Sequence, residues 1–137
     1  MTVLAGLPGA GKSTWAARNA GEALVVTGDD IRTGGADPNA VFHRMREQAR
    51  KALAEGRDVI VDACSLRKTD RSVWKSIASA VGASTELVVM RTPLSTCRIR
   101  DAARSHPAGI DWARAFENLN ELYRIAPREG WGRVRLV

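Results

Sequence analysis

Short apolar runs alternate with amphipathic stretches along the 137 residues of the chain. The runs are TVLAG (2–6), ALVVT (23–27), DVIVDA (58–63), TELVVM (85–90) and GRVRLV (132–137). Each has the length and the β-branched content of a strand. Strands that alternate with helices specify a parallel sheet with right-handed crossovers and helices on both faces. We therefore predict an α/β fold with a five-stranded parallel sheet, built as a single domain over residues 1–137.

The stretches between these runs carry apolar residues at helical spacing. We predict helices at KSTWAARNA (12–20), PNAVFHRMREQARKALAEG (38–56), RSVWKSIASAVG (71–82), PLSTCRIRDAARSH (93–106) and DWARAFENLNELYRIA (111–126). In the third of these helices, the predicted inward residues are Val73, Trp74, Ile77 and Val81. In the last helix, the predicted inward stripe is Trp112, Ala115, Phe116, Leu119, Leu122 and Tyr123.

The loop after the first predicted strand is GLPGAGKST, residues 6–14, and it matches the phosphate-binding pattern GxxxxGK[ST] between a strand and a helix. Glycines let the backbone wrap round a phosphate with its N–H groups pointing inward, and the helix start adds a positive dipole end. Lys12 is expected to reach the β- and γ-phosphates of ATP, and the Ser13 hydroxyl to ligate Mg²⁺. The predicted nucleotide-binding residues of this loop are Gly9, Ala10, Gly11, Lys12, Ser13 and Thr14.

Acidic residues follow the second and third predicted strands, at the edge of a parallel sheet where ligands bind. Asp29 and Asp30 come after the second strand, with Arg32 two places on. Transfer of a phosphoryl group to an alcohol needs a carboxylate that orients the hydroxyl and accepts its proton, and an arginine can hold a phosphate of the acceptor. Asp62 ends the third strand, where it would hold the hydration shell of magnesium or a neighbouring group of the site. Ala63 follows it in place of a glutamate that would activate water, which counts against a motor or switch ATPase.

A lid is expected at about residues 93–110, after the fourth predicted strand. It carries Arg98, Arg100 and Arg104, of which Arg100 and Arg104 are four positions apart and would share a helical face. Arginines on such a segment can close over a triphosphate and stabilise charge on the transferring group. Pro107 to Gly109 would end the helix and allow a hinge.

The chain is basic, with a formal net charge of +6 and a pI of about 10.1. Residues 91–137 hold nine arginines, no lysine and five carboxylates, which suggests a polyanionic partner. No apolar run approaches the roughly 20 residues that span a bilayer, and the first residues lack the pattern of a signal peptide. Cys64 and Cys97 have no metal-ligand spacing and agree with a reducing compartment. We expect a soluble, cytoplasmic protein that does not bind membranes.

With these residues in hand, the chain resembles the kinase domain of phage-type polynucleotide 5′-kinases, a P-loop kinase fold, over nearly its whole length. GLPGAGKSTWAA is similar to the phosphate loop of that family, Asp29-Asp30-Ile31-Arg32 to its Asp-Asp-aromatic-Arg motif, and VIVDACSL to its Asp-Thr-Asn-Leu strand end. Arg100 and Arg104 match its pair of lid arginines. The chain departs from the family at Ile31, at Thr27-Gly28 and at Cys64-Ser65. We expect a stand-alone kinase without a phosphatase domain.

The resemblance implies a role for each matching residue. Asp29 would be the general base for the 5′-hydroxyl, and Arg32 would grip the 3′-phosphate of the terminal nucleotide. Lys12 and Arg104 would stabilise the transferring phosphoryl group, Ser13 would hold magnesium, and Arg100 would contact the nucleotide. Asp30 and Asp62 would lie on the side of the substrate, which is the 5′-OH end of DNA or RNA.

Two other functions fit the same motifs. A kinase of a small alcohol, such as a nucleoside, a sugar acid or an antibiotic, would use the same scaffold, with Arg32 on a carboxylate or phosphate of the substrate. A non-catalytic module would bind nucleic acid through its charge and use ATP only as a ligand. The basic pI favours a polynucleotide acceptor over a small one, and intact Lys12, Asp29 and Asp62 favour an enzyme over a module. The sequence leaves the oligomeric state open.

Overall fold

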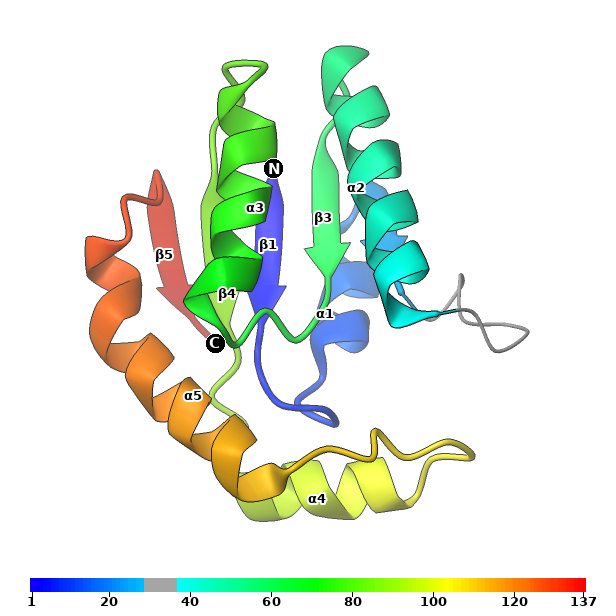
Figure 1. Ribbon diagram of the computed structural model, residues 1–137, viewed down its shortest axis with the longest axis vertical. Helices are drawn as coiled ribbons and strands as arrows, with labels where there is room; N and C mark the ends of the chain where they lie inside the picture. Colours follow the sequence, from blue (N-terminus) through cyan, green and yellow to red (C-terminus); the bar gives the residue numbers. More distant parts are fainter. Residues whose placement is uncertain (29–36) are drawn as a thin grey trace.

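A parallel sheet of five strands lies at the centre of the part of the chain that the structure describes (Figure 1). The structure is a computed structural model, and it describes residues 1–28 and 37–137. The strands are β1 (Thr2–Ala5), β2 (Leu24–Thr27), β3 (Val59–Asp62), β4 (Glu86–Val89) and β5 (Arg133–Leu136). Their order across the sheet is β2-β3-β1-β4-β5, and all neighbouring pairs are parallel. The predicted α/β fold and parallel sheet are confirmed.

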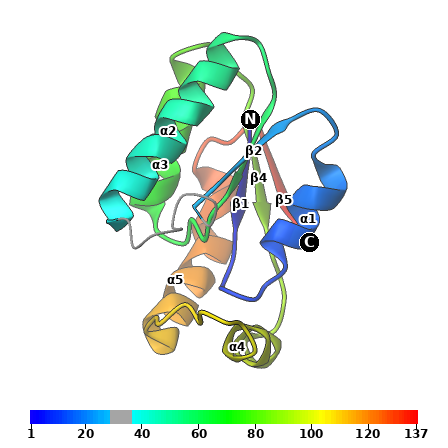
Figure 2. The same cartoon turned by 90° about the vertical axis from the view of Figure 1, so that its right-hand side faces the viewer.

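Helices cover both faces of this sheet. They are α1 (Lys12–Asn19), α2 (Pro38–Ala54), α3 (Lys68–Ser79), α4 (Leu94–Ala102) and α5 (Trp112–Ile125), and a 3₁₀ turn, η1 (Ala126–Arg128), follows α5. Figure 2 shows α2 and α3 on one side of the sheet and α1 on the other. Helix α4 lies beyond the carboxyl ends of the strands, next to the loop that connects β1 to α1 (Figures 1 and 2).

The core follows from the apolar strands and from one face of each long helix. All four residues of β3 are buried, as expected of a strand that is covered on both sides. The periodicity of α2 predicts an inward face of Val41, Phe42, Met45, Ala49, Ala52 and Leu53, and the helix buries all of these except Phe42, which is partly buried. Full burial of a valine, leucine or methionine side chain stabilises the fold by roughly 1.5–3 kcal/mol, so these contacts hold α2 firmly on the sheet.

Two predicted core residues lie at the surface. Val81 is 44% exposed because α3 ends at Ser79, two residues before it. Phe116 is 38% exposed on α5, whose buried residues are Ala115, Leu119 and Leu122. Arg71 differs in the opposite direction. A charged residue at the start of the predicted third helix is expected to be exposed, but its side chain is fully buried.

Helix α4 is shorter than predicted, and this changes the position of one lid arginine. The helix ends at Ala102, so Arg104 lies beyond it and does not share a helical face with Arg100. The Asp101 carboxylate explains the early end, because its Oδ2 accepts a hydrogen bond of 3.0 Å from the Ala108 backbone N–H. The chain therefore turns back on itself after Ala102. Among the described helices, none combines the length and the apolar character needed to cross a membrane.

Candidate active site

The loop Gly6–Gly11 joins β1 to α1 and is tied to its surroundings by its own backbone. The Gly6 N–H donates to the Cys64 carbonyl at 2.9 Å, which links this loop to the loop after β3. The buried Lys12 turns back over the loop, and its Nζ donates to the Gly6 and Leu7 carbonyls at 3.1 and 2.9 Å. An ammonium group has three donors, so one N–H remains for a ligand.

Two glycines of the loop are required for different reasons. Gly9 has a φ of +76°, and a Cβ there would lie 2.4 Å from the Cys97 carbonyl oxygen. Helix α4, which contains Cys97, therefore packs directly against the phosphate loop and leaves no room for a side chain. Gly11 has a φ of +93° with open space around it, so only its left-handed backbone favours glycine.

A cavity of about 580 Å³ opens between the phosphate loop and the lid, within the size range of small-ligand sites. It is lined by the predicted loop residues Gly9, Ala10, Gly11, Lys12, Ser13 and Thr14 and by both lid arginines, Arg100 and Arg104. Trp15, Arg18, Met90, Thr92 and Val137 complete the wall and were not predicted. The described lining includes four cationic side chains and no acidic side chain, so this cavity, which we name the donor cavity, attracts a polyanion.

The lid segment is braced at both ends of α4. At its start, the Thr92 hydroxyl donates to the Ala10 carbonyl of the phosphate loop at 2.8 Å. After its end, Arg104 Nη1 lies 3.7 Å from Asp101 Oδ1, which holds this side chain near the end of α4. Burial raises the pKa of the Cys97 thiol between them, although the charges of Lys12 and Arg100 favour the thiolate.

A second, smaller cavity of about 150 Å³ adjoins the donor cavity, because Lys12, Ser13 and Arg104 line both. We name it the acceptor cavity. Its wall also contains the buried carboxylate-bearing Asp62 and the apolar face of α2. The remaining lining residues are Pro8, Gly28, Val41, Phe42, Met45, Ala63, Cys64 and Ala108.

The predicted acidic pair and its arginine, Asp29, Asp30 and Arg32, lie outside the described residues. Gly28, the residue before them, lines the acceptor cavity. Arg98, the third candidate on the lid, is exposed on α4 and lines neither cavity.

A buried ion pair holds the loop that follows β3, next to the acceptor cavity. Arg71 of α3 donates through Nη1 to the Ser65 and Leu66 carbonyls, at 2.9 and 2.7 Å, and pairs with Glu129 through its other nitrogens. Ser65 itself has a φ of +44°, a left-handed conformation that is uncommon outside glycine. The pair holds the loop that follows Asp62. Sequence reasoning missed it because an arginine on an amphipathic helix is usually solvated.

The parallel sheet, the phosphate loop and the arginine-bearing segment after β4 define a P-loop nucleotide-binding protein with the fold of P-loop kinases. Residues 1–124 match a protein family described as an AAA domain, and the chain belongs to that family. No curated protein matches the chain.

Solved structures share this fold at low sequence identity. The Mycobacterium tuberculosis APS kinase CysC, in complex with AMPPNP and APS, is 23% identical with a TM-score of 0.59, covering 89% of this chain and 96% of that one. A chain of the Pnkp1/Rnl/Hen1 RNA repair complex is 18% identical with a TM-score of 0.72; the match covers 93% of this chain and 45% of that one. A putative kinase from Chloroflexus aurantiacus is 17% identical with a TM-score of 0.68, covering 99% of this chain and 85% of that one.

Proposed function

We propose that this protein is an ATP-dependent polynucleotide kinase that transfers the γ-phosphate to the 5′-hydroxyl end of DNA or RNA. The observation that carries the proposal is the pair of adjoining cavities. Lys12, Ser13 and Arg104 line both of them. A phosphoryl group can therefore pass from a donor in one cavity to an acceptor in the other while it stays in contact with these side chains. That arrangement suits a phosphotransferase better than a hydrolase.

In the donor cavity, the triphosphate of ATP would lie along the N–H groups of Gly9, Gly11 and the start of α1. Ala10 lines the cavity, and its own N–H donates to the Leu7 carbonyl at 3.1 Å. The free donor of Lys12 would contact the β- and γ-phosphates. Arg100 and Arg104 approach from the opposite wall and would stabilise negative charge that develops on the transferring phosphoryl group.

The residues between the cavities suit Mg²⁺. The Ser13 hydroxyl and the Asp62 carboxylate are hard oxygen ligands that line one cavity, and Mg²⁺ needs few protein ligands because it keeps water and phosphate oxygens. Ser13 would bind the ion directly, and Asp62 would hold its water shell or an acceptor group. When bound, magnesium would neutralise charge on the β- and γ-phosphates.

For the acceptor, we propose the roles that the resemblance implies. The Asp29 carboxylate would take the proton of the 5′-hydroxyl as its oxygen attacks the γ-phosphorus and the bond to the β–γ bridging oxygen breaks, releasing ADP. Arg32 would hold a 3′-phosphate, and Asp30 would lie on the substrate side. Gly28 at the acceptor cavity, the basic last third and the fold shared with a chain of an RNA repair complex support a polynucleotide acceptor.

A small-alcohol kinase is the second candidate. Two observations favour it, namely the small volume of the acceptor cavity, about 150 Å³, and the fold shared with an APS kinase. In that case Arg32 would bind a carboxylate or phosphate of the small acceptor.

The deciding experiment is transfer of γ-labelled phosphate from ATP with Mg²⁺ to a 5′-hydroxyl oligonucleotide. Nucleosides and nucleoside 3′-phosphates are assayed beside it, and Lys12→Ala serves as the inactive control. Label on the oligonucleotide supports the proposal. Label on a nucleoside alone indicates the second candidate, and bound ATP with no label on any acceptor indicates a non-catalytic binding module.

A further inference from the structure

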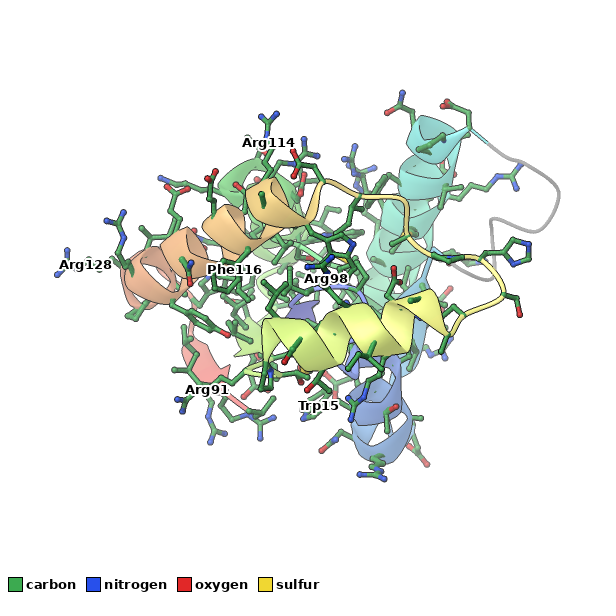
Figure 3. The ribbon with its side chains drawn as sticks, turned by 90° about the horizontal axis from the view of Figure 1, so that it is seen from below. Trp15, Arg91, Arg98, Arg114, Phe116 and Arg128 are labelled. Carbon is green, nitrogen blue, oxygen red and sulfur yellow. The ribbon has the colours of Figure 1, made fainter. Side chains whose placement is uncertain are left out.

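We infer that the outer face of the lid binds the sugar–phosphate backbone of a single-stranded acceptor beyond its 5′ end. This inference rests on the proposed function and names a second contact region for the same substrate. The surface consists of Arg91, Arg98, Arg114, Phe116 and Arg128, and we call it the α4–α5 face. Figure 3 looks onto it: Arg98 lies between the two helices, and Arg114 and Arg128 mark the two ends of α5 and η1.

The four arginines of this face have no partner within the described protein. All four are exposed, and none of their side chains forms an ion pair or hydrogen bond with a residue of 1–28 or 37–137. The Arg133 and Arg135 side chains differ, since Glu86 pairs with both. Exposed guanidinium groups without a protein partner are free to contact phosphates.

The carboxylates that balance these arginines in the sequence are mostly engaged inside the fold. Asp101 is buried and accepts from the Ala108 N–H, and Glu129 is paired with Arg71. Asp111 caps the start of α5 by accepting from the Arg114 N–H at 3.1 Å. Of the five carboxylates in residues 91–137, only Glu117 and Glu121 remain exposed without such a bond. These two glutamates lie three and seven residues after Arg114, on the same side of α5, so the excess of positive charge is clearest at Arg91 and Arg98, which matches a polyanion.

The face is continuous with the acceptor cavity. Arg104 and Ala108 line that cavity, and the segment that contains them runs directly from α4 to the first turn of α5, where Arg114 lies. Helix α4 thus has two sides: Cys97 and Arg100 contact the phosphate loop and donor cavity, while Arg98 is directed away from both cavities. A strand whose 5′ end lies in the acceptor cavity can follow the 103–110 segment onto this face.

Phe116 favours a single strand over a duplex. Phe116 is 38% exposed although its helical position predicts burial. Figure 3 shows it on the side of α5 toward α4, opposite to Arg114. An exposed ring offers a stacking surface for an unpaired base, whose face a duplex hides.

The test compares a long and a minimal acceptor. KM is measured for a 5′-hydroxyl single strand of about 20 nucleotides and for a nucleoside 3′-phosphate, at several salt concentrations. The variant is Arg98→Ala with Arg114→Ala, and the matched control is Arg50→Ala with Arg57→Ala. Both control arginines are exposed and lie at the carboxyl-terminal end of α2 or just after it, at the opposite end of the sheet from α4 (Figure 1).

We expect the face variant to raise KM for the long strand about tenfold at 0.1 M salt and to lower the slope of log KM against log salt by about 1.4, for two lost phosphate contacts. KM for the nucleoside 3′-phosphate and for ATP should stay within about twofold of wild type, as should all values of the control. Phe116→Ala should raise KM about fivefold for a single strand and leave a duplex end unchanged.

Equal KM changes in the face variant and the control would overturn the inference while leaving the proposed function intact. So would equal KM values for the long and minimal acceptors in the wild type. If no oligonucleotide is phosphorylated, the proposed function fails. In that case, anisotropy titration of a fluorescent single strand tests binding to the α4–α5 face separately from catalysis. Equal affinity in the wild type and the face variant would overturn the inference.

Discussion

Arg71 of α3 and Glu129, which follows η1, form a buried ion pair across 58 positions of the sequence, with Arg71 Nε donating to Glu129 Oε2 at 2.9 Å. Their side chains are 0% and 6% exposed. Trp131 Nε1 donates to the same carboxylate at 3.0 Å, and Arg71 also holds the Ser65 and Leu66 carbonyls. The pair therefore connects the loop after β3, next to the acceptor cavity, with the segment that leads into β5.

Removing one partner of this pair should destabilise the protein strongly. Glu129→Gln leaves the Arg71 charge buried without a counterion, and we expect a loss of about 3–5 kcal/mol in the free energy of unfolding, measured by denaturant titration. Arg67→Ala is the control, because Arg67 pairs with Asp70 at 2.9 Å but is 68% exposed. That change should cost less than about 1 kcal/mol. Similar losses in the two variants would contradict the structural role of the buried pair.

The same carboxylate should make stability depend on pH. Burial acts to raise the pKa of Glu129, but hydrogen bonds from Arg71 and Trp131 and the charges of Arg71 and Lys75 outweigh it, so the folded pKa lies below the ordinary value of 4.5. The stabilisation is thus fully present above about pH 4.5 and is lost as the pH falls through the folded pKa. Unfolding free energies measured from neutral to acid pH should fall less steeply in Glu129→Gln than in wild type. Parallel curves would exclude Glu129 as the group responsible.

The two glycines of the phosphate loop should respond differently to alanine. At Gly9 the new Cβ would meet the Cys97 carbonyl oxygen at 2.4 Å, so α4 has to move and the donor cavity changes shape. At Gly11 nothing lies within 4 Å, and only the left-handed backbone costs about 1–2 kcal/mol. Titration with a fluorescent ATP analogue should show at least a tenfold loss of affinity, about 1.4 kcal/mol, in Gly9→Ala. The loss of affinity in Gly11→Ala should be smaller. A larger loss in Gly11→Ala than in Gly9→Ala would show that the contact between α4 and the loop does not control nucleotide binding.

The two cysteines should differ in reactivity toward an alkylating reagent. Cys97 is fully buried, and burial raises the pKa of its thiol, so little thiolate forms and the reagent has no access. Cys64 is partly exposed and lines the acceptor cavity. We expect Cys64, studied in Cys97→Ser, to react at least about 100-fold faster than Cys97 in Cys64→Ser. Comparable rates in the folded protein would mean that α4 opens readily from the phosphate loop.

The sequence predicts those features of this fold that local pattern determines. The phosphate loop lies between β1 and α1 as its glycines and Lys12 indicate, and α2 buries all of its predicted face except Phe42. The predictions that failed depend on side-chain contacts that helical periodicity does not show. Asp101 turns the chain after Ala102 and separates Arg104 from the helix, and Glu129 makes the burial of Arg71 possible. Glu129 lies 58 positions from Arg71. Asp101 is only three residues before Arg104, but helical periodicity does not indicate its bond to the Ala108 N–H.

The acidic pair after β2 gives the sharpest test of the proposed chemistry. If Asp29 accepts the proton of the attacking hydroxyl, Asp29→Asn should lower kcat by about 10²–10⁴-fold with little change in ATP affinity, because the loss falls on proton transfer. Asp30→Asn is the matched control and should retain most of kcat. Arg32→Ala should raise KM chiefly for acceptors that carry a 3′-phosphate. A loss of ATP affinity in Asp29→Asn would assign this carboxylate to the donor, and equal effects of Arg32→Ala on acceptors with and without the phosphate would remove its proposed contact.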